Sequence, residues 1–197
     1  MKTIVKGLFT LIILFLFSCD FSHKQEVADL KEVHDNWSYS GETSPEHWAE
    51  LEKNSDCSGN SQSPINIIDI HTIEDKDQES TIELYYSPET ILNKVRNNGH
   101  SIQFDFDKGD SIAYNKINFN LVQIHFHEPS EHLINGVRYP IEIHLVHQSK
   151  EKYYTVLSIL GIEGIESQTM EKMESFLPLK KGQEKEINKS FDLSRLF

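Results

Sequence analysis

The stretch Leu121–His147, LVQIHFHEPSEHLINGVRYPIEIHLVH, decides the fold predicted for this chain. It contains five of the ten histidines in the 197-residue sequence. Two apolar runs flank Asn135-Gly136, a dipeptide typical of tight turns between paired strands. Because side chains alternate between the two faces of a strand, His125 and His127 would share one face of the first run. If the second run pairs with the first, His144 would meet them.

Three converging imidazoles with an open fourth position are the ligand set of a catalytic zinc ion. A histidine on a half-buried strand is usually a core residue, so the His-x-His pair alone is weak evidence. Gln123 and Glu142 strengthen the prediction, because each lies two residues before a histidine and on the same face. Histidine ligands usually donate their second ring N–H to a carbonyl or carboxylate. The residues thus predict Zn²⁺ bound by His125, His127 and His144, with Gln123 and Glu142 behind them.

Length and charge set the class of protein. The sequence is long enough for one domain with a sizeable core. Its net charge of −12 argues against a nucleic-acid partner and suits a protein that handles small molecules. The sequence predicts no oligomeric state.

The N-terminus reads as a targeting segment. Lys2 and Lys6 precede the stretch Leu8–Phe17, which is apolar except for Thr10 and too short to span a bilayer. Residues 1–18 are predicted to be a lipoprotein-type signal peptide cleaved before Cys19, although an ordinary secreted protein cleaved nearby is the alternative. Residues 19–34 read as a polar tether, and residues 35–197 as the domain. We therefore expect an exported protein, periplasmic or at the cell surface, that meets the membrane only through a lipid on Cys19.

The remaining patterns predict a mostly β domain with short peripheral helices. Strands are expected over residues 81–86, 101–106, 111–114 and 153–162. Ser44 and Pro45 predict the start of a short helix that ends near Lys53. Spacing of the apolar residues predicts a helix over 167–177, ended by Pro178. Residues 188–197 show no clear period.

Several short motifs follow one another along the chain. They are Trp37-x-Tyr39-x-Gly41, Pro45-x-x-Trp48, Gln62-Ser-Pro-Ile-Asn66-Ile, Asn97-Asn-Gly-His100, Gln123-x-His125-Phe-His127, Ser130-Glu131-His132 and Glu142-x-His144-Leu-Val-His147. With these motifs the sequence resembles the α-class carbonic anhydrases, particularly exported bacterial ones, from about Trp37 to Phe197. The resemblance implies a large twisted central mixed β-sheet with short helices around it.

The resemblance also implies an activity, the zinc-dependent conversion of CO₂ to bicarbonate by attack of a zinc-bound hydroxide. Neutral imidazole ligands leave the metal its full charge, which makes a bound water acidic. By resemblance, His100 is the proton shuttle, Glu131 is the carboxylate that orients a threonine near the metal, and Val146 and Val156 line the CO₂ pocket. Tyr39, Asn98 and Gln103 match polar groups that order the active-site water. Without the resemblance, His100 and Glu131 would be ordinary turn residues, and His132 and His147 read as structural.

The family pattern continues past the last residue, because no Thr-Thr-Pro-Pro motif occurs in this sequence. The resemblance therefore implies a chain truncated at its C-terminus. The absent part would carry C-terminal strands of the sheet, the threonine that Glu131 orients and the cysteine that pairs with Cys57. Strands without neighbours form association-prone edges, so the expectation is low stability and weak or absent CO₂ hydration.

Two other classes of protein remain open. A non-catalytic relative would keep the fold as a binding module, although such relatives usually lose a ligand histidine. A cupin-like metalloprotein is suggested by His125-x-His127-x-x-x-Glu131, in which Glu131 would be a metal ligand. Replacing Glu131 distinguishes the cupin-like site from the anhydrase.

Overall fold

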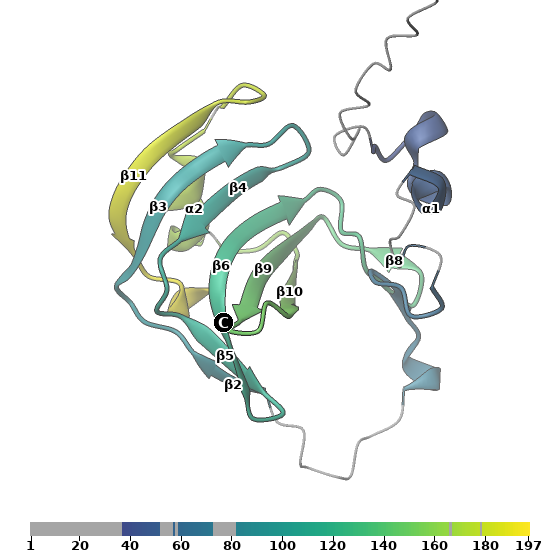
Figure 1. Ribbon diagram of the computed structural model, residues 1–197, viewed down its shortest axis with the longest axis horizontal. Coiled ribbons are helices and arrows are strands. Elements are labelled where there is room, and N and C mark those ends of the chain that lie inside the picture. Colours follow the sequence, from purple (N-terminus) through teal and green to yellow (C-terminus); the bar gives the residue numbers. More distant parts are fainter. Residues whose placement is uncertain (1–36, 52–56, 58, 73–81, 166, 178) are drawn as a thin grey trace, which may run out of the picture.

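Eight strands form one curved sheet whose pairings among the described residues are all antiparallel (Figure 1). The structure is a computed structural model that describes residues 37–51, 57, 59–72, 82–165, 167–177 and 179–197. The strand order is β10-β9-β6-β4-β3-β11, and β5 joins β2 to β6 beside this path. The strands are β2 (Ile82–Tyr85), β3 (Thr90–Asn97), β4 (Ile102–Phe106), β5 (Ser111–Tyr114), β6 (Ile117–His127), β9 (Ile141–Ser149), β10 (Tyr154–Gly161) and β11 (Glu184–Phe191).

A smaller sheet and short helices lie around the curved sheet. In the smaller sheet, β1 runs parallel to β7, and β7 pairs with β8 in an antiparallel hairpin. Its strands are β1 (Asn66–Ile67), β7 (Leu133–Ile134) and β8 (Val137–Arg138). The helical elements are the 3-10 turns η1 (Gly41–Thr43), η2 (Pro45–His47), η4 (Asp69–His71) and η5 (Ser194–Leu196), and the α-helices α1 (Trp48–Leu51) and α2 (Gln168–Glu174).

The predicted mainly-β architecture with short peripheral helices is confirmed, with one correction to its detail. The large sheet was expected to be mixed, but the parallel pairing lies in the small sheet, between β1 and β7. The helix expected from Ser44 begins there as the 3-10 turn η2, and α1 is a single turn. The helix α2 is N-capped by Ser167, whose hydroxyl accepts a hydrogen bond from the backbone N–H of Met170.

The Asn135-Gly136 turn is present, but it does not join the two long strands directly. Asn135 and Gly136 have φ angles of +52° and +80°, as a type I′ turn requires at both central residues. They connect β7 to β8, so this small hairpin stands between β6 and β9. The long strands still pair side by side, because burial of their alternating apolar residues sets the register.

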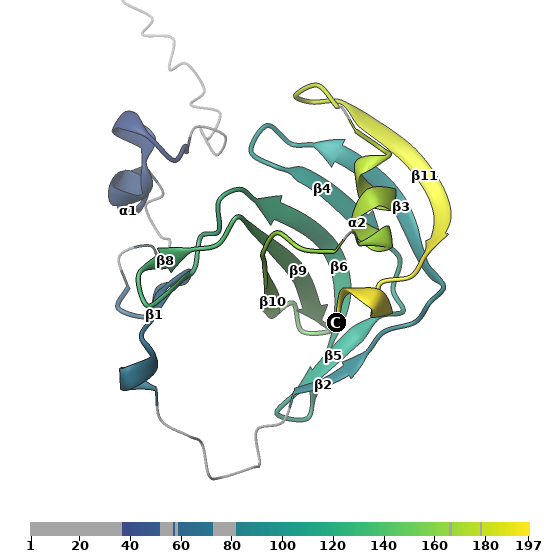
Figure 2. The ribbon, with the colours of Figure 1, turned by 180° about the vertical axis from the view of Figure 1, so that it is seen from behind.

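Strand alternation divides the curved sheet into a core face and a site face. On the core face, Ile124 of β6 and Leu145 of β9 are fully buried. Met173 of α2 joins the same cluster, and α2 lies across this face near β3 and β11 (Figure 2). Full burial of a Leu or Ile side chain stabilises a fold by about 1.5–3 kcal/mol. The core therefore holds β6 and β9 together, and the side chains between the buried ones project to the opposite face.

The sequence patterns did not predict β11, and its irregularity explains why. The register with β3 shifts between Glu186 and Lys189, and Asn188 between them has a φ of +52°. A bulge of this kind breaks the period-two alternation that a strand otherwise shows. The side chains along β11 are also mostly exposed, so the apolar signal is weak.

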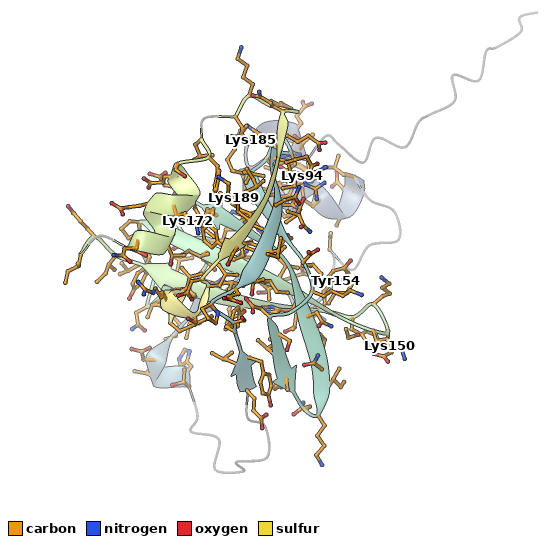
Figure 3. All side chains as sticks on the ribbon, turned by 90° about the vertical axis from the view of Figure 1, so that its left-hand side faces the viewer. Lys94, Lys150, Tyr154, Lys172, Lys185 and Lys189 are labelled. Carbon is orange, nitrogen blue, oxygen red and sulfur yellow. The ribbon has the colours of Figure 1, made fainter. Side chains whose placement is uncertain are left out.

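The two edges of the curved sheet differ in charge. At the β11 edge, Lys185 and Lys189 lie beside Lys94, whose ammonium is 3.0 Å from a carboxylate oxygen of Glu184 (Figure 3). Charged side chains of this kind protect a strand edge from pairing with other chains. The eight residues of β10 at the other edge, from Tyr154 onward, carry no charge. Among the described residues β10 pairs with β9 alone, and the β10 edge lacks the charged side chains that border the β11 edge.

The predicted signal peptide, Cys19 and the tether lie outside the described residues. Within the described part of the chain, no helix has the length and apolar character needed to cross a membrane.

Candidate metal centre

The three predicted ligand histidines meet on the site face of β6 and β9. In the register of the two strands, His125 lies opposite His144 and His127 lies opposite Glu142. The imidazole centroids are 4.6–5.1 Å apart. One ring nitrogen from each histidine lies within 4.8 Å of the other two, so the three nitrogens can share one metal ion. The predicted convergence is therefore present.

The second ring nitrogen of two of these histidines is held by a neighbour on the same strand. His125 Nδ1 lies 3.0 Å from Gln123 Oε1, which directs its Nε2 toward the cluster. His144 Nε2 lies 2.7 Å from Glu142 Oε1, which directs its Nδ1 there. Because a carbonyl or carboxylate oxygen only accepts, each of these ring nitrogens carries the proton and the other nitrogen keeps a lone pair. Both imidazoles thus present a lone pair toward the cluster.

His127 provides the test of whether the residues fit a metal. Its Nε2 is buried and makes no hydrogen bond, although Glu131 Oε2 lies 3.3 Å away. Burial of a polar atom without a hydrogen bond destabilises the folded protein, and a bound ligand would remove this cost. A cation bound by the three nitrogens would satisfy it, and the all-imidazole donor set suits Zn²⁺.

Burial keeps the imidazoles of His125 and His127 neutral, as binding of a metal requires. Burial, together with the nearby His144 and His127, lowers the pKa of His125 from 6.5 to about 4. Burial also lowers the pKa of His127, against the opposing influence of Glu131. The rings therefore do not have to lose a proton to bind a metal at neutral pH.

Glu142 is the hydrogen-bonding centre behind the histidine cluster. It is fully buried, and its Oε1 accepts from His144 Nε2, from His132 Nδ1 at 2.5 Å and from the Ser158 hydroxyl. Its Oε2 accepts the backbone N–H groups of Glu131 and His132, each at 2.8 Å. Burial alone would raise the pKa of Glu142, but these hydrogen bonds outweigh it and hold the pKa far below its usual value.

Sequence reasoning treated His132 as structural and did not single out Ser158. His132 fits that description, because its ring Nδ1 donates to Glu142 and its side chain lines neither of the two cavities described below. Ser158 left only a faint signal, a hydroxyl residue inside an apolar strand.

Glu131 faces both the histidine cluster and Tyr39. The Tyr39 hydroxyl donates a 2.8 Å hydrogen bond to Glu131 Oε1. Glu131 Oε2 is 3.9 Å from His144 Nδ1, so the carboxylate lies at the edge of the cluster. Burial and the neighbouring Glu131 raise the pKa of Tyr39 well above its usual value, which keeps Tyr39 a hydrogen-bond donor.

The histidines form one wall of a cavity of about 380 Å³. Aromatic and apolar side chains form much of the rest, which favours a small, weakly polar molecule beside the histidines. A second cavity of about 730 Å³ shares part of this lining and extends to His100. The first cavity is lined by Trp37, Tyr39, Trp48, Leu51, Cys57, Pro64, His125, His127, Glu131 and His144.

His100 lies on the exposed turn after β3, where the sequence placed it. Its ring stacks on Trp37 with centroids 3.9 Å apart and an interplanar angle of 11°. Asn98 shapes the turn, because its Oδ1 accepts the backbone N–H of His100 at 2.9 Å. Asn98 Nδ2 also donates to Gln103 Oε1 at 3.3 Å, and Gln103 lies opposite His125. The structure thus links the turn that carries His100 to the ligand strand.

Val146 and Val156 are paired across β9 and β10, on the face that carries His144. Neither lines the two cavities described above, and Val156 is 49% exposed. Their predicted contact with CO₂ stays a prediction.

Comparison with known proteins gives a consistent assignment. A sequence profile described as eukaryotic-type carbonic anhydrase matches residues 43–196. A carbonic anhydrase of Neisseria gonorrhoeae is 36% identical over 166 residues, which are 83% of this chain and 63% of that protein. Dioscorin dioA3 of Dioscorea japonica is 33% identical over 180 residues, which are 88% of this chain and 62% of that protein. The chain thus spans less than two thirds of the length of these curated relatives.

The fold agrees with the sequence match. The solved structure of the α-carbonic anhydrase of Thermovibrio ammonificans, in complex with the inhibitor sulfanilamide, matches with a TM-score of 0.73 at 34% identity. The match covers 81% of this chain and 70% of that one. By sequence and by fold, this chain belongs to the eukaryotic-type carbonic anhydrase family.

Proposed function

We propose that this chain forms the metal centre of a zinc enzyme that interconverts CO₂ and bicarbonate. The observation that carries the proposal is the cluster of His125, His127 and His144, each with one ring nitrogen directed at a shared point. Three neutral imidazoles leave a tetrahedral ion one open position, as a catalytic zinc site requires. Held by these three residues, a zinc ion would supply an acidified water as the nucleophile.

The chain's own residues would hold that ion, orient its ligands and transfer protons near it. Gln123 and Glu142 fix the tautomers of two ligands, which holds the lone pairs in place. Tyr39 and Glu131 form a hydrogen-bonded pair at the edge of the cluster, positioned to orient a group there. His100 lines the cavity that leads outward, and an imidazole can accept a proton on one nitrogen and release one from the other.

The sequence supports a further part of this proposal, the location. The charged and apolar pattern of residues 1–18 and the following Cys19 favour an exported protein that is anchored to the envelope by a lipid.

Removal of the metal tests the proposed reaction. The purified chain is expected to hold about one zinc ion and to hydrate CO₂ in a stopped-flow pH-indicator assay. Dialysis against a chelator should abolish hydration, and added zinc should restore it. The same assay tests whether hydration is as weak as the sequence predicts. A chain that holds zinc without any hydration would instead favour the non-catalytic relative.

One distance favours a second candidate, the cupin-like metal site. Glu131 Oε2 lies 3.3 Å from His127 Nε2, close enough for both atoms to be ligands of one ion. The Glu131→Gln variant separates the two functions. In the anhydrase, zinc affinity should hold while hydration falls on the order of tenfold to a hundredfold, because the oriented carboxylate is lost.

The cupin-like site would give the opposite result for Glu131→Gln, a clear loss of zinc affinity. Glu128→Gln is the matched control, because Glu128 is a neighbouring acid that is exposed and lines the outer cavity. Zinc affinity and hydration of the control should both match the parent chain.

A further inference from the structure

Ser158 interrupts the apolar run Val156–Leu160 in the edge strand β10. In the sheet register it lies directly opposite His144. Directly paired residues of neighbouring strands project to the same face, so Ser158 points to the site face. Its hydroxyl donates a hydrogen bond to Glu142 Oε1, the atom that also accepts from His144 Nε2.

We propose that Ser158 is a positioning residue that sets the affinity of this site for zinc by holding Glu142 against His144. The inference rests on the zinc centre of the proposed function. The Glu142 carboxylate accepts five hydrogen bonds from three segments of the chain. Two backbone N–H groups and the His132 ring come from the segment after β6, His144 comes from β9, and Ser158 is the donor from β10.

The hydrogen bond from Ser158 on β10 matters because it restrains Glu142 Oε1 from the side opposite to β6. The donors on the β6 side fix Oε2 and one flank of Oε1, whereas Ser158 reaches Oε1 from the opposite neighbour strand. Without that hydroxyl, Oε1 loses its restraint on the β10 side, and the His144 ring that follows it gains freedom. A ligand whose orientation is not held costs ordering free energy on binding, and removal of such supporting groups typically weakens metal affinity 10–100-fold.

Zinc dissociation constants of four proteins test the inference, measured by competition with a chromophoric chelator. Ser158→Ala should bind zinc on the order of tenfold more weakly than the parent chain. Ser158→Thr keeps the hydroxyl and should restore an affinity close to that of the parent. Thr155→Ala is the matched control, because Thr155 lies on the same strand, opposite His147 and on the other face. It should leave the affinity unchanged.

The pattern across the variants separates positioning from a general effect on β10. Unchanged affinity in Ser158→Ala would overturn the inference, and so would equal losses in Ser158→Ala, Ser158→Thr and Thr155→Ala. A parent chain that binds no zinc would overturn both this inference and the proposed function. The experiment measures zinc affinity and not CO₂ hydration. A chain that binds zinc but is inactive therefore still tests the role of Ser158.

A second variant keeps the test possible if Ser158→Ala does not fold. If metal-free Ser158→Ala shows no cooperative melt, Ser158→Cys takes its place, because a thiol has similar volume and is only a weak donor. The zinc affinity of Ser158→Cys should lie between that of the parent chain and that expected for Ser158→Ala. An affinity equal to that of the parent chain would contradict the proposal. The visible spectrum of the cobalt(II)-loaded protein should change in Ser158→Cys and not in Thr155→Ala.

Discussion

Replacing His127 with alanine is expected to abolish tight zinc binding, from about one ion per chain to about none after dialysis. His127 Nε2 is the ring nitrogen of the cluster that is buried without a hydrogen bond, so its deletion removes a donor that no other contact in the described structure replaces. Two imidazoles remain, and a two-ligand site does not enclose a zinc ion. Metal analysis of the dialysed protein by mass spectrometry provides the measurement.

The matched control for His127→Ala is His71→Ala. His71 ends the exposed turn η4 and is not among the described residues that could hold a metal ion. Its replacement should leave about one zinc ion per chain. Melting of the metal-free proteins by circular dichroism shows whether His127→Ala is folded. Full zinc retention by a folded His127→Ala would refute the three-histidine centre.

Acid is expected to destabilise the metal-free protein by about 3 kcal/mol through His147 alone, between about pH 7 and about pH 4. His147 is fully buried on the core face, and its Nε2 lies 2.7 Å from the Tyr86 hydroxyl. Burial lowers its pKa from 6.5 to about 4. Between these two values the unfolded chain binds a proton that the folded chain does not. Stability therefore rises with pH across this window and falls on acidification.

Urea unfolding at a series of pH values measures this dependence, with a chelator present throughout. His147→Gln should show a shallower loss of stability between about pH 6.5 and about pH 4, because the titrating group is gone. His71→Gln, at an exposed position, should follow the parent chain. The contributions of His125 and His127 are common to all three proteins and cancel in the comparison. Parallel curves for the parent and His147→Gln would contradict the assignment.

Local patterns predicted the ligand strands well, because alternation is a property of neighbouring residues. The order Gln123-x-His125-x-His127 places all three side chains on one face whatever the strand pairs with, and Glu142-x-His144 does the same for its strand. The His100 turn was also predicted, since Asn98 and the glycine that follows are local turn signals. The Asn135-Gly136 turn was predicted correctly, but not the strands that it joins.

Elements with weak or broken periodicity were beyond the reach of sequence patterns. β11 is exposed along most of its length and carries a bulge at Asn188, so its pairing with β3 depends on the partner strand. The parallel pairing of β1 with β7 joins short segments 67 residues apart in the sequence, and nothing local encodes such a contact.

The sequence by itself predicted the cluster of three histidines, the two side chains that hydrogen-bond to it and the family. These follow from residue identity at fixed short spacing, which strand geometry converts directly into a shared face. The tertiary structure decided which other groups complete the site: the Ser158 hydroxyl on Glu142, the Trp37 ring on His100 and the Tyr39 hydroxyl on Glu131. The physical reason is that each of these contacts joins segments distant in the sequence, and only the packed core, which sets strand order and register, brings them within hydrogen-bonding or stacking distance.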